Sequence, residues 1–191
     1  MGWVGVTRIV AGELGGRRLV TPPGRNTRPT SDRVREALFA ALESLTDVSG
    51  CRFADLYAGS GAVGLEAASR GAAAVLFVEA DPRAARIVRA NITALDLAER
   101  CRVLPARLPG ALAAGPDGQP YDVVFADPPY EVPSEEIGEL LRALVTYGWL
   151  ADGAVVVVER SARSGPLPTV EEITHLRSRR YGESVLWYLA H

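Results

Sequence analysis

Lysine is absent from this 191-residue sequence, and cysteine and histidine occur only twice each. The two cysteines, Cys51 and Cys101, form no CxxC pair, and His175 and His191 both lie late in the chain. Because a protein metal site needs several such ligands at short spacing, the sequence predicts no metal site. Neither cysteine has a base close to it in sequence, so we expect both thiols to be buried structural residues.

Long apolar runs are absent as well. No run approaches the roughly 18 residues of a membrane-spanning helix, and residues 1–8 lack the basic, apolar and small-residue pattern of a secretory signal. Hydrophobic residues make up 48% and charged residues 23%, which is ordinary for a soluble globular protein. The composition excludes a largely disordered chain, and we expect a cytoplasmic protein with one principal domain.

Charge is distributed unevenly along the chain. Residues 1–35 carry seven arginines and two acidic residues, a net charge of +5, whereas the remainder carries 14 arginines and 21 acidic residues. A basic segment on an acidic body predicts an arm that contacts phosphate groups. All 21 basic residues are arginine, which base-composition bias in the genome explains better than selection for bidentate phosphate contacts.

The basic segment has the pattern of a β-hairpin. Residues 7–10 and 17–20 are strand-like and flank a glycine-rich turn. Three prolines and a glycine in residues 21–29 predict an extended linker, after which apolar residues recur at helical spacing between Val34 and Leu45. Thr30 or Ser31 is placed to cap that helix.

From Cys51 onward, strand-like and helical segments alternate, which predicts an α/β fold with a mostly parallel sheet. The expected strands are residues 52–57, 74–79, 101–104, 123–126 and 154–159. The expected helices are residues 61–70, 82–95, 106–114 and 134–146. Residues 173–180 and 184–190 flank a short turn, so we expect the sheet to end in an antiparallel hairpin. A plain dinucleotide-binding fold would continue with crossover units instead.

A glycine-rich GxGxxG motif at residues 59–64 lies between the first of these strands and its helix. Glu79, 20 residues beyond Gly59, ends the next strand, where a carboxylate can accept hydrogen bonds from both hydroxyls of a ribose. This pair of features fits a nicotinamide dinucleotide or S-adenosylmethionine almost equally, and a purely structural glycine turn is the third reading.

The sequence Asp-Pro-Pro-Tyr at residues 127–130 follows the apolar run 123–126. Each proline fixes its own φ and keeps the preceding residue extended, and neither donates a backbone hydrogen bond. The segment therefore offers mainly acceptors, namely the Asp127 carboxylate and the carbonyls of Asp127 and Pro128. Such a rigid acceptor group suits a planar substrate that carries an amino group.

Two neighbours favour S-adenosylmethionine as the cofactor. Asp55 precedes the glycine-rich loop, where its carboxylate can bind the amino-acid part of that cofactor but would repel a pyrophosphate. The loops that carry Gly59, Glu79 and Asp127 converge at the carboxyl edge of the expected sheet, where open α/β sheets bind ligands. The expected cofactor-binding residues are Asp55, Ala58, Gly59, Ser60, Gly61, Gly64, Glu79, Ala80, Ala106 and Asp127.

These motifs resemble those of the amino-methylating class I methyltransferases, and the N-terminal segments resemble the RsmD family of small-subunit ribosomal RNA guanine methyltransferases. The first likeness is carried by residues 55–61, 78–81 and 127–130, the second by residues 8–12, 16–19 and 28–39. DNA adenine methyltransferases share the first set, whereas residues 28–39 are specific to RsmD. The run Leu104-Pro105-Ala106-Arg107 departs from such enzymes, which commonly have a polar residue beside the adenine there.

The RsmD resemblance implies a Rossmann-like class I methyltransferase sheet that methylates a guanine 2-amino group in 16S rRNA, with S-adenosylmethionine as cofactor. It implies that residues 1–29 form an RNA-binding extension of a catalytic domain, residues 30–191, acting on the small subunit or its assembly intermediate. Nothing in the chain requires a dimer, so we expect a monomer. The expected RNA contacts are Arg8, Arg17, Arg18, Arg28 and Arg33. Alternatively, Arg28, Arg33 and Arg35 hold the first helix against the catalytic domain.

The expected catalytic residues are Asp127, Pro128 and Tyr130. The guanine amino group is a poor nucleophile because its lone pair is delocalised, so Asp127 and the Pro128 carbonyl would orient it by accepting its hydrogen bonds. An ordinary pKa of about 4 for Asp127 favours orientation over proton transfer, although both roles stay open. Tyr130 would stack on a base turned out of the RNA; its alternative is a core aromatic residue.

Three other functions share part of this pattern. A methyltransferase for adenine in DNA or for a protein glutamine would use the same motifs. A NAD-dependent oxidoreductase would need a histidine, lysine or tyrosine arranged for hydride transfer, which the sequence does not show. An inactive RNA-binding protein would have no need of both Glu79 and Asp127.

Overall fold

The computed structural model describes residues 6–22 and 32–191. Most of the expected linker lies outside these residues, as do Arg28 and the expected helix caps, Thr30 and Ser31. Residues 7–10 and 17–20 were expected to pair, and the strands β1 (Val6–Arg8) and β2 (Arg18–Val20) do form an antiparallel hairpin.

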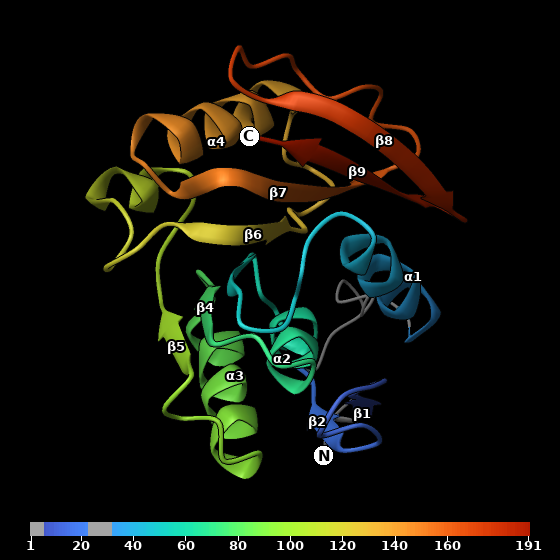
Figure 1. The fold of residues 1–191 in the computed structure, drawn as a ribbon, viewed down its shortest axis with the longest axis vertical. Helices are drawn as coiled ribbons and strands as arrows, with labels where there is room; N and C mark the ends of the chain where they lie inside the picture. The colour runs from blue at the N-terminus through green and yellow to red at the C-terminus, as the bar shows by residue number, and fades with distance from the viewer. Residues whose placement is uncertain (1–5, 23–31) are drawn as a thin grey trace.

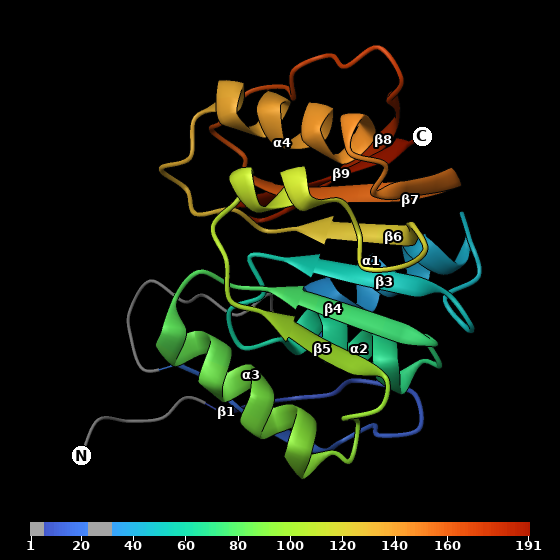
Figure 2. The same cartoon turned by 90° about the vertical axis from the view of Figure 1, so that its left-hand side faces the viewer.

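The main sheet has seven strands in the order β5-β4-β3-β6-β7-β9-β8. Its strands are β3 (Arg52–Leu56), β4 (Ala74–Val78), β5 (Cys101–Leu104), β6 (Tyr121–Ala126), β7 (Leu150–Ser161), β8 (Thr174–Tyr181) and β9 (Ser184–Ala190). Strands β3 to β7 are parallel, and the arrowheads of β3, β4, β5 and β6 reach the same edge in Figure 2. β9 is antiparallel to β7 and to β8, so the expected C-terminal hairpin is confirmed.

Helices cover both faces of this sheet (Figure 1). They are α1 (Asp32–Glu43), α2 (Ala62–Ser69), α3 (Pro82–Ala94), α4 (Ser134–Thr146) and the short 3-10 helix η1 (Gly110–Ala114). Buried residues of α1, α2 and α3 pack on one face of the sheet, and those of α4 and η1 pack on the other. The alternating helices and strands confirm the predicted α/β class.

Two predicted element boundaries differ most from the structure. The helix expected over residues 106–114 is only η1, because Pro105 and Pro109 remove backbone donors and disfavour a helical residue before each of them. The strand expected from Ala154 begins at Leu150 instead. The extension was not predicted because Gly153, at φ +75°, interrupts the strand-like pattern of the sequence. The pairing of β7 with β6 shifts register at this point.

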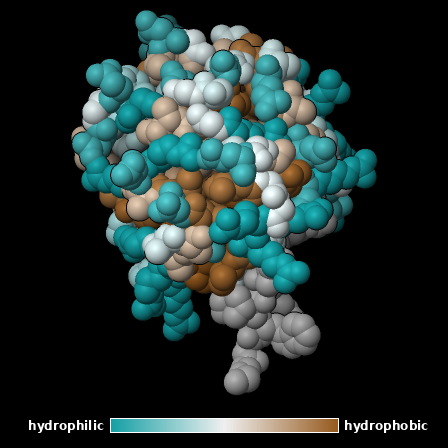
Figure 3. All heavy atoms as spheres, turned by 60° about the horizontal axis from the view of Figure 1, so that its bottom comes forward, coloured by the Kyte–Doolittle hydropathy of each residue, from teal (hydrophilic) through white to brown (hydrophobic). Residues whose placement is uncertain are grey.

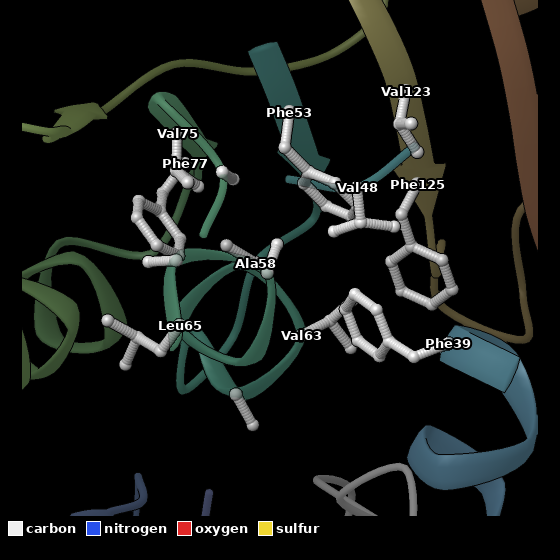
Figure 4. Packing of buried hydrophobic residues seen from close by; sticks show 14 of the residues in the cluster. Phe39, Val48, Phe53, Ala58, Val63, Leu65, Val75, Phe77, Val123 and Phe125 are labelled. Atoms are coloured by element: carbon white, nitrogen blue, oxygen red, sulfur yellow. The ribbon is translucent and has the colours of Figure 1, made fainter. Parts of the chain in front are cut away.

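The larger core lies between the sheet and α1 to α3. Phe53, Phe77 and Phe125 come from three neighbouring strands and project to this face, where Figure 4 shows them around Ala58 and α2. The rings of Phe39, on α1, and Phe53 stack with their centroids 6.2 Å apart. Side chains alternate between the two faces along a strand. The strand residues next to these phenylalanines, such as Ala54, Leu76 and Val124, therefore fill the second core under α4.

Helix α2 lies very close to the sheet, since all eight of its residues are buried. A Cβ atom added to Gly64 would lie 2.3 Å from Cε1 of Phe77, whose ring lies beside α2 in Figure 4. At Gly61, which precedes the helix at φ +77°, an added Cβ would lie 3.1 Å from Val88. These two glycines of the GxGxxG motif therefore permit close helix–sheet packing.

The N-terminal hairpin packs on α2 and α3, below the sheet in Figure 1. Ile9 and Leu19 are fully buried in the larger core. The carboxylate of Glu66, itself buried in α2, accepts hydrogen bonds from the amides of Val10 at 2.7 Å and Ala11 at 2.9 Å. The hairpin thus shares the core of residues 32–191.

Hydrophilic residues cover most of the molecular face in Figure 3, around a smaller hydrophobic area. None of the helices in the described part of the chain is long and apolar enough to cross a membrane. Both cysteines are buried, as expected, and loss of hydration raises the pKa of each thiol to about 12.

Candidate cofactor and substrate site

A cavity of about 680 Å³ opens at the carboxyl edge of the sheet. It is lined by the loops that follow β3, β4, β5 and β6, and by Thr21 and Pro22 from the N-terminal segment. β3 and β6 are neighbours at the position where the order of the strands reverses. Open α/β sheets bind ligands at such a position, because the two loops there leave the sheet in opposite directions.

The glycine-rich loop and Glu79 are joined at this cavity. The Gly59 amide donates a hydrogen bond to Oε2 of Glu79 at 2.7 Å, and the Asp81 amide donates to Oε1 at 2.7 Å. Gly59 has φ +57°, and a Cβ added to it would meet no atom within 4 Å. The loop therefore leaves open space in front of its backbone, with a carboxylate beside it.

Asp55 lies at the floor of the cavity, near the end of β3. Its side chain is buried and accepts a hydrogen bond from the Gly64 amide at 2.9 Å. Loss of hydration raises the pKa of Asp55 to about 8, and the negative charge of Glu79 adds to this effect, whereas the bond from Gly64 opposes it. Asp55 is thus a buried carboxylic acid that is largely neutral at pH 7.

Asp127 follows β6, the neighbour of β3, and its amide donates to the Leu56 carbonyl at 3.3 Å. Desolvation raises the pKa of Asp127 well above its ordinary value, and repulsion by the negative charge of Glu159 and by that of Asp55, when Asp55 is ionised, raises it further. The expectation of an ordinary pKa was therefore wrong, because the sequence does not show how closely these carboxylates gather. A carboxylate with a raised pKa is a stronger base.

The segment after Asp127 forms the rim of the cavity. Pro128 is buried, and the Val132 amide closes the turn by donating to the Pro129 carbonyl at 3.0 Å. Tyr130 lines the cavity and is 55% exposed, which excludes the alternative of a core aromatic residue. The exposed ring is free to stack on a planar group at the entrance.

The structure brings most of the sequence-predicted site residues to one cavity. Those that line it are Asp55, Ala58, Gly59, Ser60, Glu79, Ala80, Ala106, Asp127, Pro128 and Tyr130. Gly61 and Gly64 do not line it; they act through the backbone and through packing. The Ala106 amide donates to the Glu79 carbonyl at 3.2 Å, which fixes the loop after β5 beside Glu79.

Some cavity residues were not expected from the sequence. Tyr57 lines the cavity with φ +62°, and its buried hydroxyl has no partner among the residues that the structure describes. Its place after an apolar strand gave no signal of this geometry. Thr21 and Pro22 belong to the expected linker, and no local pattern could have placed them at the cavity.

The arginines expected to bind RNA differ in their contacts. Nε of Arg8 pairs with Asp32 at 2.8 Å, and Arg17 donates to the Ala94 carbonyl at the end of α3 at 3.1 Å. Arg18 and Arg33 are exposed, and Arg28 lies outside the described residues.

Arg35 has a structural role, as the alternative suggested, but it holds the first helix to the N-terminal hairpin rather than to the rest of the catalytic domain. The Arg35 side chain is fully buried and donates to Asp32 at 2.8 Å and to the Arg8 carbonyl. It therefore ties the start of α1 to the N-terminal hairpin.

Among the residues that the structure describes, no group of three or more potential ligands could hold a metal ion.

Known proteins resemble this chain over nearly its whole length. A family model described as conserved hypothetical protein 95 matches residues 7–190. The "Ribosomal RNA small subunit methyltransferase D" of Escherichia coli K12 is 37% identical over 185 residues, which cover 97% of this chain and 89% of that protein. The "Putative rRNA methyltransferase YlbH" of Bacillus subtilis is 34% identical over 177 residues, covering 92% and 94%. The solved "Putative methyltransferase yhhF from Escherichia coli" has a TM-score of 0.86 at 32% identity and covers 98% of each chain.

Proposed function

The chain belongs to the conserved hypothetical protein 95 family, and from this premise we propose that it transfers a methyl group from S-adenosylmethionine to a guanine 2-amino group in 16S rRNA. The family assignment confirms the resemblance to RsmD. One observation carries the proposal: the glycine-rich loop, Glu79 and Asp127 line a single cavity. The proposal includes a monomer that acts in the cytoplasm on the small subunit or its assembly intermediate.

The residues of the cavity fit this cofactor. Glu79 would accept hydrogen bonds from the ribose hydroxyls, and Asp55 would lie near the ammonium group of the cofactor. The open space at Gly59 would let the cofactor lie against the backbone of the glycine-rich loop. When bound, S-adenosylmethionine supplies a methyl group on a positively charged sulfur. The acidic side chains of Asp55, Glu79 and Asp127 favour such a cation, whose charge promotes ionisation of Asp55 and Asp127, and they oppose the pyrophosphate of NAD.

Asp127 and Pro128 would position the substrate amine. An ionised Asp127 would accept one hydrogen bond from the amino group, the Pro128 carbonyl would accept another, and together they would direct the nitrogen lone pair away from the ring. The raised pKa of Asp127 also makes its carboxylate a suitable acceptor for the proton that the nitrogen loses. Both roles require the ionised form, which a cationic cofactor nearby favours.

Tyr130 would hold the target base at the entrance. A guanine in folded RNA can reach Asp127 only if it leaves its stack, and stacking on an aromatic ring offsets part of that cost by about 1–3 kcal/mol. The exposure of Tyr130 at the rim supports this role.

The decisive experiment is methyl transfer to small ribosomal subunits purified from cells that lack the protein. With labelled S-adenosylmethionine, we expect one mole of methyl group per mole of subunits, mapped to N2 of a single guanine in 16S rRNA. Label on adenine of duplex DNA or on a glutamine of a protein substrate, but not on subunits, would establish one of the alternatives. Calorimetric binding of NAD in preference to S-adenosylmethionine would instead establish the oxidoreductase.

Arg18 offers a test of the RNA-binding surface. We expect Arg18→Glu to weaken binding to small subunits and to reduce the slope of log affinity against log salt concentration by about one, because an exposed phosphate contact is lost. Arg83→Glu, on an exposed position of α3, is the matched charge reversal. Equal effects of the two variants would mean that only net charge matters, and unchanged binding in both would leave the hairpin a structural role.

A further inference from the structure

Asn91, in the last turn of α3, connects two parts of the molecule that are far apart in sequence. Its side chain is buried. Oδ1 accepts a hydrogen bond from the Val20 amide at 3.0 Å, while Nδ2 donates to the Val20 carbonyl at 2.9 Å and to the Ser60 carbonyl at 3.2 Å. One side-chain amide thus joins the end of strand β2 to the glycine-rich loop.

The chemistry of these contacts fixes the orientation of the Asn91 amide. The Val20 amide is a donor and must face Oδ1, whereas the carbonyls of Val20 and Ser60 are acceptors and must face Nδ2. Both Nδ2 hydrogens are used, and the flipped orientation would oppose like groups at all three contacts. No other side chain of this size supplies one acceptor and two donors in this arrangement.

Each end of this connection leads to the cavity. Ser60 lines it directly, next to Gly59, which Glu79 holds. Thr21 and Pro22 directly follow Val20 and also line it, and Thr21 is only 4% exposed. Pro22 keeps Thr21 extended, so the backbone that leaves the Asn91 contact continues along the cavity wall.

We infer that the N-terminal hairpin contributes directly to the cofactor site. In this inference Asn91 is the positioning residue: through it, cofactor binding and the docking of residues 20–22 at the cavity depend on each other. The inference rests on the proposed cofactor, S-adenosylmethionine. Because the coupling of two sites is reciprocal, an ordered hairpin strengthens cofactor binding and a bound cofactor stabilises the hairpin. The affinity for a substrate that contacts the hairpin would then depend on whether the cofactor is bound.

The variant Asn91→Asp tests the connection with almost no change in shape. It keeps an acceptor for the Val20 amide but places an oxygen against the carbonyls of Val20 and Ser60. We expect the affinity for S-adenosylhomocysteine, measured by calorimetry, to fall at least about 10-fold, because buried carbonyls lose their donors. KM for S-adenosylmethionine should rise by a similar factor, while kcat at saturating cofactor stays within about two-fold.

Ser69→Ala is the matched control. Oγ of Ser69 also anchors the hairpin, accepting from the Leu14 amide at 2.9 Å and donating to the Ala11 carbonyl at 2.6 Å, but at the turn. We expect this variant to lower the melting temperature and to leave the affinity for S-adenosylhomocysteine within two-fold. Equal losses of affinity in both variants, or none in Asn91→Asp, would overturn the inference.

Hydrogen exchange in the wild-type protein tests the same coupling without a variant. Saturation with S-adenosylhomocysteine should slow exchange of the Val20 amide at least 10-fold and change that of the Leu14 amide much less, because of these two amides only that of Val20 is bonded to Asn91. Equal protection of both amides, or of neither, would contradict the inference. If the wild type binds no S-adenosylhomocysteine, the proposed function itself fails, and that outcome is distinct from binding without selective protection of Val20.

Discussion

Replacing Asp127 with asparagine is expected to lower the rate of methyl transfer by about 10³-fold at saturating cofactor. Asparagine matches the shape of aspartate and can accept one hydrogen bond from the substrate amine. It lacks the negative charge that stabilises a nitrogen becoming positive, and it cannot take the proton that the nitrogen loses. The affinity for S-adenosylhomocysteine should change only a few-fold, because Asp55 and Glu79, which would bind the ammonium group and the ribose of the cofactor, are unchanged in this variant.

Single-turnover assays with pre-bound S-adenosylmethionine measure this loss without interference from product release. Glu135→Gln is the control, since it removes an exposed carboxylate from the first turn of α4 without touching the cavity, and it should react at the wild-type rate. If Asp127→Asn also reacts within a few-fold of the wild-type rate, the amine is oriented by other groups and Asp127 has no catalytic role.

The pH dependence of the same assay separates the charge of Asp127 from its shape. Desolvation, Glu159 and Asp55 raise the pKa of Asp127 well above its ordinary value, so the ionised fraction grows as the pH increases. The single-turnover rate of the wild type should therefore rise with pH and level off once Asp127 is ionised. The residual rate of Asp127→Asn should lack that rise, because asparagine does not titrate.

Much of the fold could be predicted because its signals are local. The strands β3, β4 and β6 are short apolar runs bounded by glycine, aspartate or proline, and the helices between them repeat at the expected spacing. Motifs that follow consecutive parallel strands must meet at one edge of the sheet, so the sequence was sufficient to bring Gly59, Glu79 and Asp127 together.

Other properties of the site depend on contacts between distant residues. The raised pKa of Asp127 reflects its approach to Glu159 and Asp55, which no spacing in the sequence reveals. The sequence predicts that Thr21 and Pro22 belong to a linker, yet they line the cavity because the hydrogen bonds between Asn91 and Val20 hold the preceding residue in place. Electrostatic environment and the docking of the N-terminal segment are three-dimensional properties, so local patterns identify the groups but not how they act together.

Asp55→Asn is expected to stabilise the protein without cofactor, and increasingly so as the pH rises. Burial raises the pKa of Asp55 to about 8, so between about pH 4 and pH 8 the folded chain holds a proton that the unfolded chain releases. The free energy of unfolding therefore falls in this window by up to about 1.4 kcal/mol per pH unit. Asparagine keeps an acceptor for the Gly64 amide and does not titrate, so it avoids this loss.

Urea unfolding of both proteins at pH 5, 6.5 and 8 measures the effect as a difference, in which the other titrating groups cancel. The advantage of Asp55→Asn should be smallest at pH 5 and largest at pH 8. A variant that is equally destabilised at every pH would mean that the carboxyl group of Asp55 is not a neutral acid in the folded chain.

The cofactor should reverse this order of stability. If Asp55 lies near a bound ammonium group, asparagine removes a charge-assisted interaction and lowers the affinity for S-adenosylmethionine by about 10- to 100-fold. Saturating cofactor then stabilises the wild type far more than the variant. Asp122→Asn, which alters the acceptor of the Arg52 amide at the opposite edge of the sheet, should leave the affinity within two-fold.

Calorimetry at pH 7 in buffers of different ionisation enthalpy completes the test. Because Asp55 is largely protonated in the free protein, binding of a cation beside it should release a proton to the buffer in the wild type and release less in Asp55→Asn. Equal proton release in the two proteins would place the ammonium group elsewhere. The buried carboxyl group that lowers the stability of the free chain at neutral pH is, on this account, the group whose ionisation the cofactor's positive charge drives.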